Sequence, residues 1–128
     1  MASNLVVDTL SKGGVTLNTD ELVDTNSTQV CKAWVNFNGT STVAIRDSYN
    51  VSSITDNGTG KYTVNLATAM PDANYSTCLY GCGTSTGGYS RLDNPATVST
   101  TAYGPILTRN TSDANIDWLY VSLAFFGN

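Results

Sequence analysis

The sequence of 128 residues contains no histidine, a single glutamate (Glu21) and charged residues at only 12% of its positions. Histidine is the commonest general base of enzymes and the usual proton acceptor of a serine triad, so its absence removes the most frequent catalytic arrangements. The three cysteines, Cys31, Cys78 and Cys82, are one short of a four-ligand zinc site, and an odd number does not suit a disulfide framework. The sequence therefore predicts a protein without a catalytic site, metal ion or cofactor.

Aspartates are the remaining candidates for acid–base chemistry, since glycosidases can act through two carboxylates about 5 to 9 Å apart. Asp93, Asp113 and Asp117 lie in the second half of the chain and could form such a pair. Each also suits the turns and strand ends where solvated aspartates are usually found. We interpret them in this second way and expect the protein not to be an enzyme.

Long apolar runs are missing as well. No window approaches the roughly 18 apolar residues of a membrane-spanning helix, and the first residues have neither the basic start nor the apolar core of a signal peptide. We therefore expect no membrane insertion and a soluble protein that is made in a cytoplasm. The formal net charge of -4 and the isoelectric point near 4.3 disfavour nucleic acid as a partner, because phosphate backbones are bound by clustered Lys and Arg.

Threonine, serine, asparagine and glycine are abundant instead, and this composition is typical of strands and turns. Apolar residues alternate with polar ones between Thr28 and Phe37, and the turn sequence Asp56-Asn57-Gly58-Thr59-Gly60 predicts a β-hairpin. Further strands are expected over Tyr75–Tyr80, Val98–Leu107 and Ile116–Phe126. About six to eight short antiparallel strands without a credible helix predict an all-β fold, an antiparallel β-sandwich.

The first 27 residues differ from the rest, because they contain no aromatic residue and only short apolar pairs. Such a segment buries too little apolar surface to form a core by itself. We interpret residues 1–27 as an extended N-terminal arm that anchors the protein to a larger particle, and residues 28–128 as the β-sandwich domain. A first strand pair of the sandwich would give the same pattern. The candidate anchor residues are Leu5, Val7, Leu10, Val15 and Leu17.

The last predicted strand is apolar on both faces after Asp117. A half-exposed antiparallel strand should alternate, so this strand is either central in its sheet or covered on its second face by another subunit. Both arrangements stay open, and the second predicts an oligomer. The candidate interface residues are Trp118, Tyr120, Leu123, Phe125 and Phe126.

A glycine-rich segment from Gly81 to Arg91 predicts a flexible surface loop that either contacts a partner or has none. The candidate partner-binding residues in and around this loop are Tyr80, Tyr89, Arg91 and Tyr103. We assign Trp34 and Trp118 to the core or to a subunit interface rather than to ligand stacking, because tryptophan is highly buried on average.

Three sequence blocks between Val30 and Tyr75 carry a resemblance to a known module. They are KAWVNFNGT at Lys32–Thr40, SSITDNGTGKYTVN at Ser52–Asn65 and AMPDANY at Ala69–Tyr75. In this order and spacing they resemble the small β domain found in tail-fibre and other virion surface proteins of tailed bacteriophages. The resemblance implies a homotrimer that is assembled in the host bacterial cytoplasm and located on the virion surface.

We therefore expect a non-enzymatic virion structural protein, either a tail-fibre or spike tip or a capsid decoration or head-fibre protein. Its partners would be further copies of itself, other virion proteins of the capsid or tail, and, at a fibre tip, a host-surface glycan. The alternative is a carbohydrate-binding module or adhesin, for which loops rich in Tyr, Asn and Thr would be expected and attachment to a virion would not.

Overall fold

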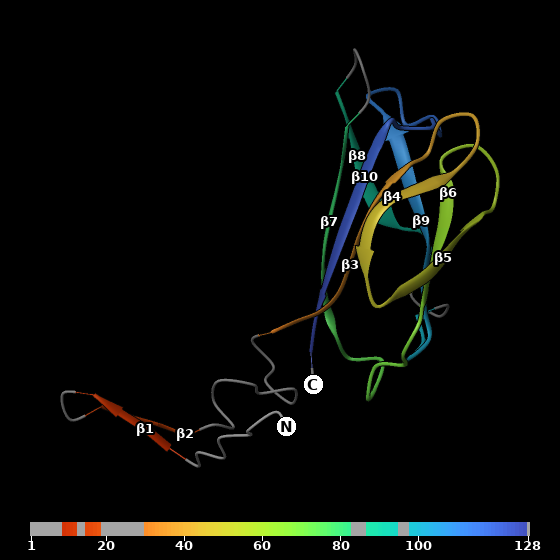
Figure 1. Cartoon of the computed structure of the whole chain (residues 1–128). Helices are drawn as coiled ribbons and strands as arrows, with labels where there is room; N and C mark the ends of the chain where they lie inside the picture. Colours follow the sequence, from red (N-terminus) through yellow and green to blue (C-terminus); the bar gives the residue numbers. More distant parts are fainter. Residues whose placement is uncertain (1–8, 13–14, 19–29, 83–86, 95–97, 128) are drawn as a thin grey trace, which may run out of the picture.

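The computed structural model describes residues 9–12, 15–18, 30–82, 87–94 and 98–127, and every regular element in these ranges is a β-strand. The strands are β1 (Thr9–Lys12), β2 (Val15–Asn18), β3 (Cys31–Asn38), β4 (Ala44–Tyr49), β5 (Val51–Asp56), β6 (Lys61–Leu66), β7 (Ser76–Cys82), β8 (Gly88–Leu92), β9 (Ala102–Asn110) and β10 (Tyr120–Phe126). Eight of them form two antiparallel sheets, sheet I in the order β4-β3-β10-β7 and sheet II in the order β5-β6-β9-β8 (Figure 1). Strands β1 and β2 pair with each other as a separate two-stranded sheet. The predicted all-β, sandwich-like architecture is confirmed.

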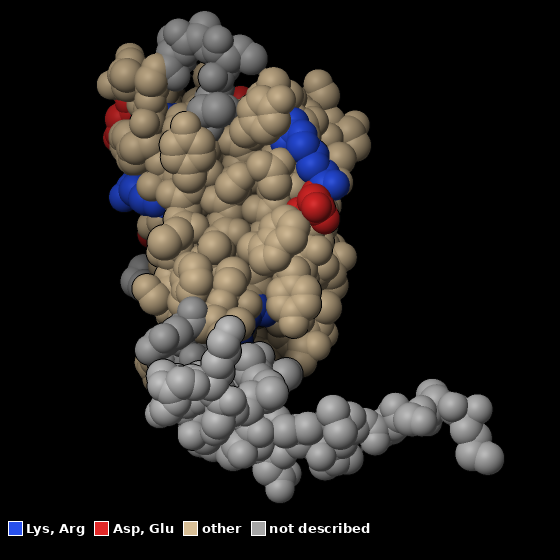
Figure 2. Space-filling model, turned by 60° about the vertical axis from the view of Figure 1, so that its left-hand side comes forward, with Lys and Arg blue, Asp and Glu red and all other residues tan. Residues whose placement is uncertain are grey.

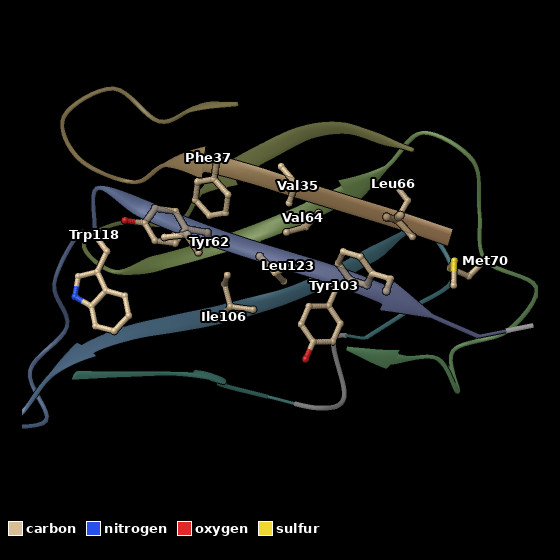
Figure 3. Close-up of a cluster of buried hydrophobic side chains, with 13 residues drawn as sticks. Val35, Phe37, Tyr62, Val64, Leu66, Met70, Tyr103, Ile106, Trp118 and Leu123 are labelled. Carbon is tan, nitrogen blue, oxygen red and sulfur yellow. The ribbon is translucent and has the colours of Figure 1, made fainter. Parts of the chain in front are cut away.

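The core lies between the two sheets, because alternate residues of each inner strand point inward. In β3 the predicted alternation is present, and the structure shows that Ala33, Val35 and Phe37 form its buried face. The core cluster is completed by Tyr62, Val64, Leu66, Met70, Tyr103, Ile106, Trp118, Val121, Leu123 and Phe125. Figure 3 shows these side chains filling the space between the layers, with Trp118 at one end of the cluster and Met70 at the other.

The side chain of Tyr62 links this core to a small buried polar cluster. Its ring packs edge to face against Phe37, with ring centroids 5.2 Å apart. Its hydroxyl group lies 2.9 Å from the Gly39 carbonyl oxygen and 2.8 Å from Asp117 Oδ1, and the same carboxylate oxygen accepts the N–H of Gly60 at 2.7 Å. The cluster therefore ties together the β3–β4 connection, the β5–β6 turn and the β9–β10 connection.

Two of these positions require glycine for steric reasons. A Cβ atom at Gly39 would lie 2.5 Å from the Tyr62 hydroxyl oxygen, inside van der Waals contact. Gly60 has a φ of +64°, and its Cβ would lie 2.6 Å from the Thr108 carbonyl oxygen. Glycine at both positions lets the two turns approach the phenol ring and strand β9 closely enough to form the polar cluster.

A single residue, Asn50, carries the chain from sheet I to sheet II between β4 and β5. Its φ of 55° lies in the left-handed region, which asparagine tolerates better than most residues. The side chain then fixes the corner, since Asn50 Nδ2 donates to the carbonyl oxygens of Lys32 and Thr68 at 3.2 Å each, and its Oδ1 accepts the Thr68 N–H at 2.7 Å. This corner closes one edge of the sandwich.

The glycine-rich segment Gly81–Arg91 differs from the predicted loop, because much of it is strand. Strand β7 continues to Cys82, and β8 begins at Gly88 and pairs with β9 from Gly88 opposite Asn110 to Leu92 opposite Ile106. The residues between these strands, 83–86, lie outside the described ranges. The glycine-rich composition therefore predicted a loop where the described residues continue β7 and begin β8.

The last strand begins at Tyr120 and not at Ile116 as predicted. Before Tyr120 the chain crosses from sheet II to sheet I, so its backbone groups bond to both layers. The N–H of Ile116 donates to the Thr108 carbonyl oxygen, and the carbonyl oxygen of Trp118 accepts the N–H of Gly39. These hydrogen bonds replace the regular pairing of a strand, and the side chain of Trp118 points into the core.

Replacing Tyr62 with phenylalanine should destabilise the protein by about 1 to 3 kcal/mol, because the Gly39 carbonyl oxygen and Asp117 lose a hydroxyl partner while the ring is kept. The matched control is Tyr49→Phe, since Tyr49 is 59% exposed, and it should change the free energy of unfolding by less than about 0.5 kcal/mol. Urea denaturation followed by circular dichroism measures both values. Equal effects of the two substitutions would contradict a structural role for the cluster.

Alkaline pH should weaken the fold through the same residue. Burial, together with Asp117, raises the pKa of Tyr62 well above its usual range, and burial raises the pKa of Tyr75 to about 12. Above about pH 10 a tyrosine of the unfolded chain loses its proton while these two keep theirs in the folded chain, so their stabilising contribution, complete below that pH, is lost as the pH rises.

The measurement is the free energy of unfolding between about pH 8 and pH 11, where each such group adds a slope of up to about 1.4 kcal/mol per pH unit. We expect a shallower decline for Tyr62→Phe than for the wild-type protein. An unchanged slope would show that Tyr62 ionises as readily in the folded chain as in the unfolded one.

Candidate functional site

The two outer faces of the sandwich differ in chemistry. The exposed large hydrophobic residues of the described chain are Val30, Trp34, Tyr49, Tyr80, Tyr89 and Tyr120. Four of these six lie on the outer side of sheet I, one on each of its strands, and we call this surface the aromatic face: Trp34, Tyr49, Tyr80 and Tyr120. With the β7 side of the sandwich turned forward, the molecule shows a broad surface with few charged groups (Figure 2).

The register of sheet I groups the four rings at two corners of the face. Trp34 lies directly opposite Tyr49, whereas Tyr80 on β7 and Tyr120 on β10 lie toward the other end of the sheet. Trp34 and Tyr80 are two strands and one two-residue step apart, which corresponds to about 12 Å. Small side chains lie between the two corners in the same outward rows, and they are Asn36, Cys78, Ser122 and Ala124.

Polar groups of the aromatic face are held in place by one another. Arg46 is the extra residue of a β-bulge between β3 and β4, and its guanidinium carbon lies 4.3 Å from the centre of the Tyr120 ring. Its Nη2 donates to the Leu119 carbonyl oxygen at 2.6 Å and its Nη1 to Asn36 Oδ1 at 3.3 Å, while Asn36 Nδ2 donates to Ser122 Oγ at 2.7 Å. The face thus carries a row of fixed amide, hydroxyl and guanidinium groups beside its rings.

A groove of about 490 Å³ adjoins the aromatic face at the Tyr49 corner. Tyr49 belongs to both, and the opposite wall comes from the segment between β6 and β7. The lining residues are Lys32, Tyr49, Asn50, Ala67, Thr68, Ala69, Met70 and Pro71. Its volume lies within the usual range of small-ligand sites, which is about 300 to 1,000 Å³.

The outer side of sheet II is polar by contrast. Asn65 Nδ2 donates to Ser53 Oγ at 3.0 Å and to Thr55 Oγ1 at 2.9 Å, and Asn57 Nδ2 donates to Thr63 Oγ1 at 2.9 Å. These side chains satisfy one another across β5 and β6 and leave no apolar patch there. We regard this side as the ordinary solvated face of the sandwich.

A charged cluster lies on the same polar side, at β8 and β9. The Tyr89 hydroxyl group donates to the Asp113 carboxylate, and Arg109 Nη1 lies 2.8 Å from the same carboxylate oxygen. The Tyr89 hydrogen bond, followed by Arg109, lowers the pKa of Asp113, and in return Asp113 raises the pKa of Tyr89. The cluster is an exposed electrostatic contact that closes the loop after β9.

The four residues predicted to form one partner-binding surface are not brought together. Tyr80 lies on the aromatic face of sheet I, whereas Tyr89 and Arg91 point outward from β8 in sheet II. Tyr103 is in the core, 8% exposed, and its hydroxyl oxygen accepts a hydrogen bond from Thr77 Oγ1 at 2.9 Å. The reason is that the chain crosses from one sheet to the other between Tyr80 and Tyr89.

The predicted interface residues are divided as well. Leu123 and Phe125 are 3% and 0% exposed and Trp118 is 2% exposed, all within the core of a single chain. Tyr120 and Phe126 point to the outer side, where Tyr120 is 47% exposed and Phe126 is half-buried. Strand β10 lies between β3 and β7, so its central position in the sheet accounts for much of its two-sided apolar pattern.

Two of the five proposed anchor residues lie outside the described ranges, and three lie within them. Leu5 and Val7 lie outside the described ranges, and Leu10, Val15 and Leu17 belong to β1 and β2, where only the backbone is described. In that hairpin Leu10 lies opposite Leu17.

The three aspartates considered as catalytic candidates have separate surroundings. Asp117 accepts hydrogen bonds within the buried cluster, Asp113 contacts Tyr89 and Arg109, and Asp93 Oδ2 lies 4.0 Å from Lys61 Nζ. Within the described ranges, no three Cys, Asp or Glu side chains are grouped as metal ligands would be, and no helix has the length and apolar character needed to cross a membrane.

The aromatic face could not be found from local sequence pattern. Trp34 was predicted to lie in the core or at a subunit interface, but in the single chain it points outward and is 36% exposed. Its neighbours on the face come from β4, β10 and β7, which only the strand register brings beside it. Comparison with known proteins adds no further information, because no protein-family model, curated protein or solved structure matches this chain.

Proposed function

We propose that the chain is a non-enzymatic structural protein on the surface of a tailed bacteriophage particle. The observation that carries this proposal is the resemblance of the segment Val30–Tyr75 to the small β domain of tail-fibre and other virion surface proteins. In the structure this segment forms four consecutive strands, β3 to β6, which make up half of each sheet. The resembling blocks therefore belong to the framework of the sandwich.

Several residues of these blocks have defined structural roles, which supports the proposal. The block at Lys32–Thr40 supplies the buried face of β3 and Gly39, and the block at Ser52–Asn65 supplies the hairpin with Gly60 and Tyr62. In the third block Met70 is buried, and the Tyr75 hydroxyl group donates to the Ser99 carbonyl oxygen at 2.9 Å. Proteins that share these three sequence blocks would therefore share the residues of the buried polar cluster and part of the core.

The assembled form that we propose is a homotrimer, and this rests on the resemblance and on the general tendency of homo-oligomers to close by symmetry. Residues 1–27 would attach it to the particle. Two placements fit: a tail-fibre or spike tip, and a capsid decoration or head-fibre protein. Assembly would take place in the host bacterial cytoplasm, with other capsid or tail proteins as partners.

The second candidate function is a carbohydrate-binding module or adhesin, and the aromatic face favours it. Trp34, Tyr49, Tyr80 and Tyr120 are exposed on one sheet beside fixed amide and hydroxyl groups. Isolated exposed aromatic residues need no explanation, but four on one face of a small domain are typical of a binding surface. Such a surface also suits the tip of a fibre.

Quantitative mass spectrometry of purified phage particles tests the first function. We expect the protein in every particle, at a copy number divisible by three, and a trimer when the released full-length protein is measured by light scattering. A copy number on the scale of the capsid subunits would indicate a capsid location, and one on the scale of the tail fibres a tail location. Absence from the particles would contradict the virion function, and a folded monomer at micromolar concentration would contradict the trimer.

Substituting Leu123 with Asp separates assembly from folding in that measurement. Since Leu123 is in the core of one chain, the substitution should unfold the chain and not merely dissociate it. A folded monomeric Leu123→Asp variant would instead show that this residue lies between subunits.

A further inference from the structure

The aromatic face and the neighbouring groove form one continuous surface, because Tyr49 belongs to both. From the groove the surface passes over Tyr49 and Trp34 to the small residues of β10. Beyond these residues it reaches Tyr120, at the start of β10, and Tyr80 on β7. A ligand that reached from Trp34 to Tyr80 would span about 12 Å, which is more than a single sugar ring.

The chemistry of this surface suits a ligand that is both apolar and rich in hydroxyl groups. Its exposed rings are tyrosine and tryptophan, which combine a large apolar face with a polar edge. Between the rings lie an amide at Asn36 and a hydroxyl group at Ser122, whose positions are set by Arg46 and by each other. Sugars present C–H faces that can stack on such rings and hydroxyl groups that can bond to such side chains.

Charge on the surface is nearly balanced, since Lys32 at the groove and Arg46 on the face are accompanied by Asp47. Arg46 and Asp47 are adjacent in β4, and the arginine is already engaged by Asn36, the Leu119 carbonyl oxygen and the Tyr120 ring. A nucleic acid or an acidic protein would need clustered cations, which this face does not offer. An uncharged or weakly charged ligand matches it better.

A second copy of the chain is a poorer match. Four strands about 4.8 Å apart and about seven residues long cover a projected area of roughly 400 Å². A stable interface buries about 800 Å² of accessible surface on each partner, so it would have to extend beyond this face. Permanent interfaces also resemble a divided core, whereas no described Leu, Ile, Val or Met side chain within the four strands is exposed on this face. The exposed aliphatic residue Val30 comes just before β3.

We propose that the aromatic face of sheet I, with its adjoining groove, binds an oligosaccharide chain that lies across Trp34 and Tyr49 and reaches Tyr80 and Tyr120. The inference rests on the proposed function as a surface protein and names the class of partner that the surface receives. On a phage particle the chain would belong to the polysaccharide of the host surface.

The test uses the full-length protein on a printed array of purified bacterial capsule, lipopolysaccharide and teichoic-acid polysaccharides, followed by titration with the strongest-binding oligosaccharide. We expect Tyr80→Ala and Tyr49→Ala each to weaken binding by roughly tenfold or more, which is the loss typical of an aromatic residue that dominates a binding site. Tyr89→Ala is the matched control, because Tyr89 is 42% exposed but lies on sheet II, and it should leave the affinity unchanged.

Tryptophan fluorescence provides an independent reading of the same titration. The two tryptophans of the chain are Trp34, which is 36% exposed, and Trp118, which is 2% exposed. A sugar stacked on Trp34 should shift or quench the emission, and Trp34→Phe should abolish that change while Trp118 still fluoresces. Circular dichroism of each variant verifies that it is folded.

The proposal is overturned if the wild-type protein binds no polysaccharide on the array, or if the Tyr49 and Tyr80 variants bind as tightly as the wild type. It is also overturned if these substitutions dissociate the oligomer in light scattering and leave sugar binding intact, because the face would then be a subunit contact. The presence of the protein in phage particles is a separate measurement, so failure of the virion function is distinguishable from failure of the sugar site.

Discussion

The hydroxyl group of Tyr62 lies where three connections of the chain meet. The packing of the two sheets at this end of the sandwich depends on the hydrogen bonds of this hydroxyl group. A phenol group in the core must find hydrogen-bond partners, and here they are the Gly39 carbonyl oxygen and Asp117. Asp117 also accepts the N–H of Gly60. One buried group thereby fixes the distance between the turns of both sheets, and the edge-to-face contact with Phe37 transmits that position to the core.

A core closed in this way leaves the outer sides of the two sheets free to differ. The outer face of sheet II carries short polar side chains that form hydrogen bonds with one another, such as Asn65 with Ser53 and Thr55. Sheet I carries aromatic rings instead, although its strands are equally well paired and its inner face equally well buried. Because the rings of Tyr49 and Tyr80 are exposed and do not complete the core, they are the residues that we propose to contact a partner.

The features that were predicted from sequence are those encoded locally. Alternation between Thr28 and Phe37 predicted a strand with two distinct faces, and the Asp56–Gly60 turn predicted the β5–β6 hairpin. The aromatic face was missed because it depends on strand register: Trp34 meets its neighbours only once β4, β10 and β7 are placed beside β3. For β10 the period-two pattern left two arrangements open, because a central strand looks the same in sequence as one covered by another subunit. The structure shows that the strand is central in its sheet.

Hydroxyl-radical footprinting of the free, full-length protein in its native oligomeric state measures the difference between core and aromatic face most directly. Each aromatic side chain is oxidised at a rate that follows its exposure, and the pairs of like residues provide internal controls. We expect Trp34 to react faster than Trp118, and Tyr49 and Tyr80 to react faster than Tyr62. Protection of Trp34, Tyr49 and Tyr80 to the level of the core residues would contradict an open aromatic face and would show that another chain covers it.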